Sequence, residues 1–593
     1  MVPAPSTQNK ISQASRGAKG SPAAPGKRRP QATPNRLWPL LALLVILAAV
    51  LPNLASVEYD FVWDDKVMIG PELRLDEPAD LVRIWRTPFD SLLRDPVLHN
   101  AYFRPVALLS LAFDRAVWRM TPGGFHVTNV IWYALACVFL WLFAWELSGR
   151  PFLSAAGACV FALHPTHPES VDFIAGRTDV ICAAFFFASL WAAARWGPRI
   201  RSAAWKLIPA ATLLLLSLYS KEVALFAVPL PLLVLWIRDR TIGGRALARS
   251  ALPLAAAVLL YGVSRVAVLG PPALPAASPV EGSGPQILTS VSLVARYVPL
   301  LLFPVNLSAR HEVPTLTRPD GVFAAGILIL AATGVGIILL IRRRSPWAVP
   351  LFLFASTLYP LCYARIITGA LIAERFLFLP SGSIALAISL LPGAVGFFVA
   401  GIAAPIFLFL FLPRVSIWKD DLTLYSSMLR DSPRSAYVHA VLGSYYYQRR
   451  DLPRAIEHHR RAFLLKPEFN ESLLNLSAAE EESGQVDSAF AHVRLLLKLR
   501  PGYAAAWYAL GNLQVHMDAP DSAVTAYGEA IRLNPKFAQA ENNLGVVLER
   551  LGRTEEAIEH YRRSVEALPG YPDAVNNLAR LQAAPKPGAK RRP

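Results

Sequence analysis

Long apolar runs recur along the first 412 residues and constrain the fold more than any other feature of this chain. A run that approaches about 20 residues is long enough to cross a bilayer as a helix. With 54% hydrophobic and 17% charged residues, the chain is too apolar for a soluble protein of 593 residues. The fold class is therefore all-α, with a polytopic helical membrane domain of about eleven spans. The candidate spans lie near residues 37–55, 125–147, 152–164, 179–196, 205–219, 222–237, 252–269, 321–341, 348–363, 375–391 and 394–412.

Basic residues give these spans an orientation. Residues 1–36 carry basic residues and no acid, which predicts a disordered cytoplasmic tail. Nucleic-acid binding is an alternative use of such a tail, but the apolar run from Leu37 favours a retained membrane anchor. If Arg342–Arg344 is also cytoplasmic, the apolar run 286–304 must lie at the outer surface instead of crossing.

This topology places most of the polar segments on one side of the membrane. We expect that side to be extracytoplasmic. The segments are 56–124, 164–179, 221–222, 270–320, 365–374 and everything after 412.

Proline recurs every 34 residues after the membrane domain, at positions 433, 467, 501, 535 and 569. Alanine follows the same period at 455, 489, 523 and 557. This is the period of the tetratricopeptide repeat, whose helix pairs stack into an α-solenoid with a concave groove for peptides or protein partners. A spacer that binds no ligand is the alternative.

The repeat period also predicts the organisation of the C-terminal part. We expect a repeat domain over residues 416–582, a partial unit at 402–435 and a disordered basic tail at 583–593. The full units lie near 436–469, 470–503, 504–537 and 538–571, with a capping helix at 572–582.

Two polar segments are candidates for a reaction site. The connection from His164 to Asp179 holds two histidines, three carboxylates and one arginine between apolar spans. Ionisable groups at the rim of a bilayer are costly and mark pathways or reaction sites, although an ordinary polar turn is the simpler alternative. The adjacent carboxylates Asp64 and Asp65 suit a general base or a divalent-cation ligand.

The order of short motifs along the chain resembles the transmembrane and tetratricopeptide repeat-containing protein family. The resemblance covers about residues 37–582. It implies a membrane glycosyltransferase-like domain at 37–415, with a first outer loop at 56–124, and a GT-C type enzyme that passes mannose from a polyprenyl-phosphate carrier to Ser or Thr of proteins. The motifs are Asp64-Asp65, Tyr102-Phe103-Arg104-Pro105, His126-Val127-Thr128-Asn129, His164 to Ser170, Gly176 to Asp179, Ser220-Lys221-Glu222 and Glu374 to Ser381.

The resemblance implies roles for the matching residues. Asp64 or Asp65 would be the base, because a Ser or Thr hydroxyl is a poor nucleophile without a carboxylate beside it. Transfer would invert the anomeric carbon, so no second carboxylate acts as a covalent nucleophile. The leaving phosphate needs cations, and Arg177 is the foremost candidate. The other candidates for donor-phosphate binding or positioning are Arg104, His164, His167, Glu169, Asp179, Lys221, Glu222, Glu374 and Arg375.

Two questions stay open at this point. The sequence establishes no cofactor and leaves metal dependence open; a divalent metal ion would take Asp64, Asp65, His164 and His167 as ligands. Lys221-Glu222 and Glu374-Arg375 are also compatible with structural ion pairs at helix ends.

Three functions fit the sequence. The first is the membrane glycosyltransferase, whose partners are a polyprenyl-phosphate-linked sugar, a protein or peptide acceptor in the repeat groove, and the bilayer. The second is a non-catalytic scaffold whose repeats dock envelope proteins. The third is a transporter or lipid-handling relay, which would place ionisable residues at mid-span and not at helix mouths. We favour the enzyme, with its site and repeats in the periplasm of a bacterial inner membrane, or at the ER membrane if the protein is eukaryotic.

Overall fold

The computed structural model describes residues 37–70, 73, 75, 77–92, 102–197, 204–271, 282–363 and 371–583. The basic tail predicted over 1–36, and all but the first residue of the tail predicted over 583–593, lie outside these ranges. Within the described ranges the regular elements are helices, which confirms the all-α fold class.

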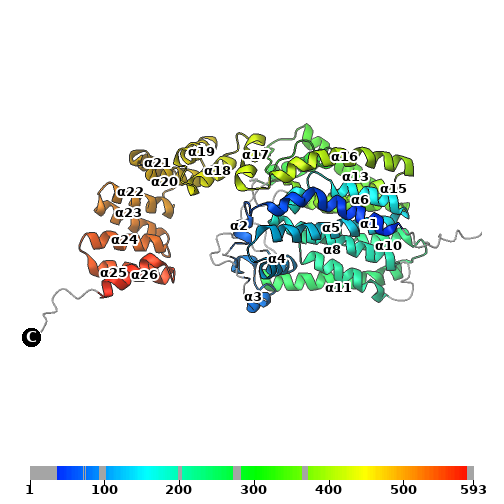
Figure 1. Ribbon diagram of the computed structural model, residues 1–593, viewed down its shortest axis with the longest axis horizontal. Helices are drawn as coiled ribbons and strands as arrows, with labels where there is room; N and C mark the ends of the chain where they lie inside the picture. Colours follow the sequence, from blue (N-terminus) through cyan, green and yellow to red (C-terminus); the bar gives the residue numbers. More distant parts are fainter. Residues whose placement is uncertain are drawn as a thin grey trace, which may run out of the picture.

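Seven helices of the described part are long and apolar enough to cross a membrane. In Figure 1 the long helices of this part run side by side in one direction and form a single bundle. The seven are α1 with η1 (Trp38–Glu58), α5 (Pro122–Ser148), η3 with α8 (Ile174–Trp196), α11 (Gly244–Leu269), α12 (Ser283–Leu302), α13 (Gly321–Arg342) and α16 (Gly393–Ser416).

The predicted count of eleven spans is not confirmed. The remaining apolar runs form helices of 9 to 13 residues, and 13 residues rise only about 20 Å, short of the ~30 Å hydrocarbon layer. Many of their hydrophobic residues pack between other helices. Helix α12 meets the same length criterion as the other six, so its length does not mark 286–304 as interfacial. The short helices are α6 (Pro151–Ala162), α9 (Ile208–Leu218), α10 (Leu230–Arg238), α14 (Ala348–Leu358) and α15 (Phe378–Leu390).

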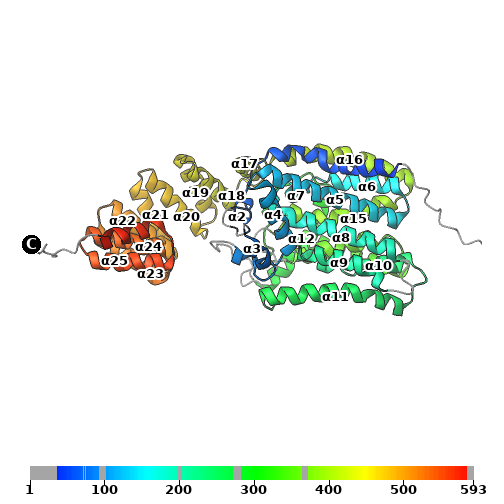
Figure 2. The same cartoon turned by 60° about the horizontal axis from the view of Figure 1, so that its bottom comes forward.

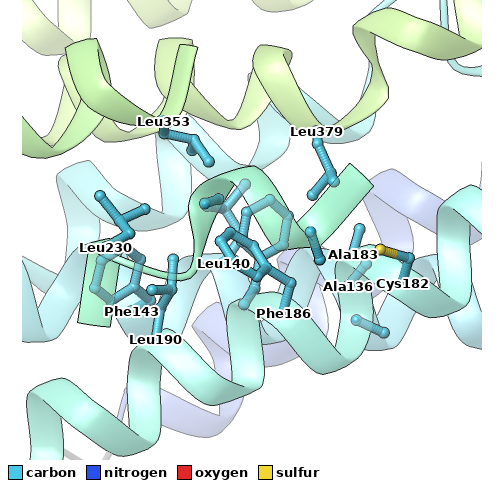
Figure 3. Close-up of a cluster of buried hydrophobic side chains, with 14 of the residues drawn as sticks. Ala136, Leu140, Phe143, Cys182, Ala183, Phe186, Leu190, Leu230, Leu353 and Leu379 are labelled. Carbon is cyan, nitrogen blue, oxygen red and sulfur yellow. The ribbon is translucent and has the colours of Figure 1, made fainter. Parts of the chain in front are cut away.

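The centre of the bundle is a hydrophobic core between α5, α8, α14 and α15. Leu140 and Phe143 of α5 face Phe186 and Leu190 of α8, and all four side chains are fully buried (Figure 3). Close packing of this kind fixes the helices relative to one another. It therefore gives a rigid base to the polar residues at one end of the bundle.

Short helices and turns cap the end of the bundle that faces the repeats (Figure 1). They carry most of the sequence motifs. The elements of this kind along the chain are α2 (Asp65–Met68), α3 (Pro78–Arg83), η2 (Phe89–Leu92), α4 (Pro105–Trp118), α7 (Pro168–Val171), η6 (Glu222–Ala227), η7 (Tyr359–Cys362) and η8 (Glu374–Leu377). The turn η5 (Ala204–Leu207) lies at the opposite end, where Leu207 packs with Ala192 and Ala193 near the end of α8.

Helix pairs extend from this end as a curved stack (Figures 1 and 2). The Leu-Gly pairs of the repeats have a steric explanation: a Cβ at Gly511 would lie 2.6 Å from the ring of Tyr527 on the paired helix. Glycine thus lets the two helices of a unit approach. The helices are α17 (Asp421–Asp431), α18 (Ala436–Gln448), α19 (Leu452–Leu465), α20 (Asn470–Glu482), α21 (Val486–Leu499), α22 (Ala504–His516), α23 (Pro520–Leu533), α24 (Ala538–Arg550), α25 (Thr554–Ala567) and α26 (Pro572–Ala583).

Candidate active site

The two carboxylates of the acidic pair have different environments. Asp65 is fully buried, and its carboxylate accepts hydrogen bonds from the backbone N–H groups of Ala175 (2.6 Å), Val62 (3.3 Å) and Ile174 (3.4 Å). Burial raises the pKa of Asp65 to about 8, although these hydrogen bonds oppose the rise. Asp65 therefore ties the first outer loop to the turn before α8.

Asp64 is exposed at the start of α2, and its side chain makes no capping hydrogen bond. Desolvation by the surrounding protein raises the pKa of Asp64, and the positive charge of Arg375 opposes that rise. Of the two carboxylates that the sequence left open as the base, Asp64 is the exposed one.

Three of the predicted cations are paired with predicted acids at the same end of the bundle. Arg104 donates to both carboxylate oxygens of Glu222, at 3.1 and 2.7 Å. The Lys221 ammonium lies 2.6 Å from both oxygens of Asp179. The Arg375 guanidinium donates to Glu169 at 2.6 Å, and so does its backbone N–H at 3.1 Å. The structure thus joins motifs that lie far apart in the sequence.

Arg104, Lys221 and Arg375 form one group, which we call the cation cluster. Phe376 lies between two of its members, with its ring centre 5.8 Å from the Lys221 ammonium and 5.6 Å from the Arg375 guanidinium. Burial lowers the pKa of Lys221, and the charges of Arg104 and Arg375 lower it further, against the effect of Asp179. The Arg375 side chain is 28% exposed, against 17% for Arg104 and 10% for Lys221, so Arg375 is the most accessible to a ligand.

Arg177 does not belong to the cation cluster, and the role expected from the sequence does not fit its position. Its side chain is 1% exposed and lies 2.5 Å from the carboxylate of Asp114. It also donates to Asn129, to the backbone oxygen of Phe125 at 2.7 Å and to the hydroxyl of Ser110 at 3.3 Å. Because its donors are used within the protein, Arg177 holds α8 against α4 and α5 and does not present itself to a phosphate.

The two histidines are also committed to the fold. His164 bonds Thr166 Oγ1 at 2.8 Å and the backbone oxygen of Leu301 at 2.9 Å, and burial lowers its pKa to about 4. His167 bonds the hydroxyls of Tyr133 and Ser381, both at 2.8 Å. A neutral imidazole has one donor and one acceptor, so neither ring has a nitrogen left for a ligand.

A metal ion held by the acidic pair and the two histidines does not fit these contacts. Both histidines and Asp65 are engaged elsewhere. Across the described ranges, no group of three or more His, Cys, Asp or Glu side chains is arranged to hold a metal ion.

Glu374 has partners that the sequence did not suggest. Its buried carboxylate accepts a hydrogen bond from Arg414 at 2.8 Å and lies 3.7 Å from His311 Nε2. It therefore links α16 to the loop after α12. Asp114, Arg414, Asp421 and Tyr437 were likewise missed, because each matches no motif and gains its role only through a distant partner.

The Arg104–Glu222 pair makes the stability of the fold depend on pH in the acidic range. Burial alone would raise the pKa of Glu222, but the Arg104 charge outweighs it and lowers that pKa from 4.5 to about 2. A lowered carboxyl pKa stabilises the fold fully above pH 4.5 and loses this effect as the pH falls toward 2. Glu222 is 47% exposed, so solvent screening keeps the effect small.

We therefore expect the melting temperature of the wild-type protein to fall between pH 4.5 and 2 by more than that of Glu222→Gln. Thermal unfolding in detergent across this pH range measures both curves. Parallel curves for the two proteins would show that the Arg104–Glu222 pair does not contribute to this pH dependence.

Comparison with known proteins supports both parts of the chain. A family model for the tetratricopeptide repeat matches residues 440–504 and 508–572, which confirms the repeats. The protein O-mannosyl-transferase F38B6.6 of Caenorhabditis elegans is 25% identical over 447 residues, which cover 71% of this chain and 62% of that protein. The protein O-mannosyl-transferase TMTC4 of Homo sapiens is 32% identical over 26% of this chain and 23% of its own length.

The chain therefore spans less than two thirds of the length of these relatives. Among solved structures, MamA is 25% identical, with 25% of this chain and 80% of that chain covered and a TM-score of 0.23. TTC0263, a tetratricopeptide repeat protein of Thermus thermophilus, is 19% identical over 29% of this chain and 93% of its own, with a TM-score of 0.26. The resemblance inferred from the motifs is confirmed by the two relatives: in its membrane helices and its repeats, this chain is similar to the protein O-mannosyl-transferases with tetratricopeptide repeats.

Proposed function

We propose that this protein is an integral-membrane glycosyltransferase that moves a sugar, expected to be mannose, from a polyprenyl-phosphate donor to Ser or Thr hydroxyls of proteins on the extracytoplasmic side. The observation that carries the proposal is the exposed carboxylate of Asp64, on a loop that Asp65 ties to Ala175 just before α8. Asp179, in the first turn of α8, binds Lys221 of the cation cluster. The proposed base and the phosphate-binding cations thus lie at the same end of the bundle.

The residues divide the chemistry between them. Asp64 takes the proton of the acceptor hydroxyl while the hydroxyl oxygen bonds to the anomeric carbon. The bond from that carbon to the phosphate oxygen breaks, and the electron pair leaves with the polyprenyl phosphate. Arg375, assisted by Arg104 and Lys221, stabilises the negative charge that develops there. Because one displacement inverts the anomeric carbon, no covalent sugar–enzyme intermediate is needed.

The junction between the membrane domain and the repeats supports a polypeptide as acceptor. A cavity of about 1130 Å³ lies there, lined by residues 305–312 and by the first repeat helices. Tyr437 and Phe469 line this cavity and also an adjacent depression that reaches Asn475. The hydroxyl of Tyr437 accepts a hydrogen bond from the indole of Trp63, the residue before Asp64. A chain extended along this groove passes Tyr437, which bonds to the loop of the proposed base.

Transfer by the purified full chain tests this function. We expect labelled mannose to pass from polyprenyl-phosphate mannose to Ser- or Thr-containing polypeptides, and mass spectrometry of the acceptor to locate the sugar on a hydroxyl side chain. If no polyprenyl-linked sugar is turned over, while the repeats still bind envelope proteins, the non-catalytic scaffold replaces the enzyme.

A further inference from the structure

The repeats do more than extend from the membrane domain, because their first two helices contact the loop that carries Asp64. We infer that α17 and α18 hold this loop in its active conformation, with Asp421 and Tyr437 as positioning residues. This role goes beyond the acceptor binding proposed above and rests on the assignment of Asp64 as the base. In Figures 1 and 2, α2 lies at the end of the bundle where α17 and α18 begin.

Asp421 binds the loop on both sides of the acidic pair. One carboxylate oxygen accepts a hydrogen bond from the backbone N–H of Trp63 at 2.9 Å. The other forms an ion pair with the Lys66 ammonium. At the start of the same loop, the backbone N–H of Asp60 donates to the carbonyl oxygen of Lys419 at 3.1 Å. The segment from Asp60 to Lys66 is therefore anchored at three points by the start of the repeat domain.

Aromatic side chains complete the contact. The Trp63 ring stacks on Phe173 at 5.7 Å, and Phe173 stacks on Trp418 at 5.2 Å. The Trp63 indole N–H donates to the Tyr437 hydroxyl at 3.0 Å. Trp418 is fully buried and lies between α16 and α17. The loop, the turn before α8 and the repeats thus share one small core.

The backbone of Trp63 explains why the loop needs such support. Its φ of 52° is in the left-handed region, which a bulky residue adopts only when its surroundings compensate the cost. This turn leads directly into α2, where Asp64 stays exposed while Asp65 points inward to Ala175. If the repeat contacts are lost, the turn relaxes and Asp64 moves away from its working position.

The connection between the two domains is short enough to transmit this restraint. Residues 417–420 separate α16 from α17. Asp421 is only 9% exposed and lies in the first turn of α17, where the helix N-terminus favours a carboxylate. Its position is thus fixed by the membrane domain as well as by the repeats.

Steady-state kinetics of Asp421→Asn and Tyr437→Phe test the inference. The first variant removes the charge opposite Lys66, and the second removes one hydroxyl. We expect kcat to fall about 10- to 100-fold in each, because small misplacements of a catalytic group are costly, while KM for the donor stays within about 2-fold. The matched control is Tyr527→Phe, which loses a hydroxyl bonded to Asn512 at 2.7 Å in the third unit and should keep full kcat.

Hydrogen exchange gives a readout that needs no activity. In Asp421→Ala we expect the amides of residues 60–66 to exchange at least about 10-fold faster than in wild type, while α22 to α25 are unchanged. If wild type transfers no sugar, the proposed function fails and this exchange still tests the positioning of the loop.

Unchanged exchange over residues 60–66, or a rise in acceptor KM with kcat intact, would overturn the inference. Faster exchange in every helix would show that Asp421→Ala unfolds the chain. In that case Tyr437→Phe, which deletes only a hydroxyl, is the variant to measure. Faster exchange confined to residues 60–66 supports the inference, and unchanged exchange there overturns it.

Discussion

Replacing Asp64 by Asn lowers kcat for sugar transfer by about 10²- to 10⁴-fold, the usual contribution of a general base. The substitution preserves the size of the side chain. Asp64 is exposed and makes no capping hydrogen bond, so the variant should insert and melt like wild type. Transfer kinetics, with thermal unfolding of the same preparation in detergent, measure the two properties together.

Asp65→Asn is the matched control, because Asp65 has the same side chain as the adjacent Asp64 but lies in a different environment. Asp65 is buried and accepts three backbone hydrogen bonds, two of them through one oxygen. An amide nitrogen cannot accept a hydrogen bond, so we expect unfolding free energy to fall by about 1–3 kcal/mol for each donor left unpaired. Transfer should persist in the folded fraction. The reverse pattern, with Asp65→Asn inactive but stable and Asp64→Asn active, would exchange the roles of the two residues.

Arg177→Gln should strongly destabilise the protein. Its removal leaves the carboxylate of Asp114 buried without its cation, since both side chains are at most 1% exposed. Breaking one half of a buried ion pair costs about 3–5 kcal/mol of unfolding free energy. A drop in the melting temperature in detergent is the expected measurement.

Two further variants separate this effect from the loss of a positive charge in general. Arg195→Gln removes an arginine that is 52% exposed, so its effect should stay within about 1 kcal/mol. The double variant Arg177→Leu/Asp114→Leu removes both charges and should recover part of the lost stability. An Arg177→Gln protein that melts like wild type but binds the donor weakly would return Arg177 to the phosphate site.

The repeats could be predicted from the sequence because their signal is periodic. A proline every 34 residues and small residues at one position report the turn and the closest approach of two neighbouring helices. Gly511 against Tyr527 illustrates why such positions repeat: the contact lies within one unit and recurs as Gly545 against Tyr561. Local, repeated contacts leave a local, repeated pattern.

The number of membrane spans was harder to predict. Helix α6 and helix α13 have similarly apolar sequences, yet α6 has 12 residues and α13 has 22. The hydrophobicity of a side chain measures the free energy of its transfer out of water, and this transfer is favourable both into the protein interior and into lipid. The sequence alone therefore does not distinguish a helix that faces lipid from one packed inside the bundle.

The site was predictable in its residue types but not in its pairings. Arg177 and Arg375 each lie within one of the sequence motifs, and only packing makes one a buried structural residue and the other an accessible cation. Glu222 finds its partner 118 residues earlier, at Arg104. Asp421 gains its role from Trp63 across the domain junction. Long-range contacts of this kind leave no local pattern in a single sequence.

The most direct test of the central claim is a single-turnover transfer assay with polyprenyl-phosphate mannose and a Ser/Thr polypeptide, comparing wild type with Asp64→Asn at matched folded concentrations. The account predicts one inverted mannosyl linkage per acceptor hydroxyl with wild type, and a rate at least about 10²-fold lower with Asp64→Asn. Equal rates for the two proteins would contradict Asp64 as the base.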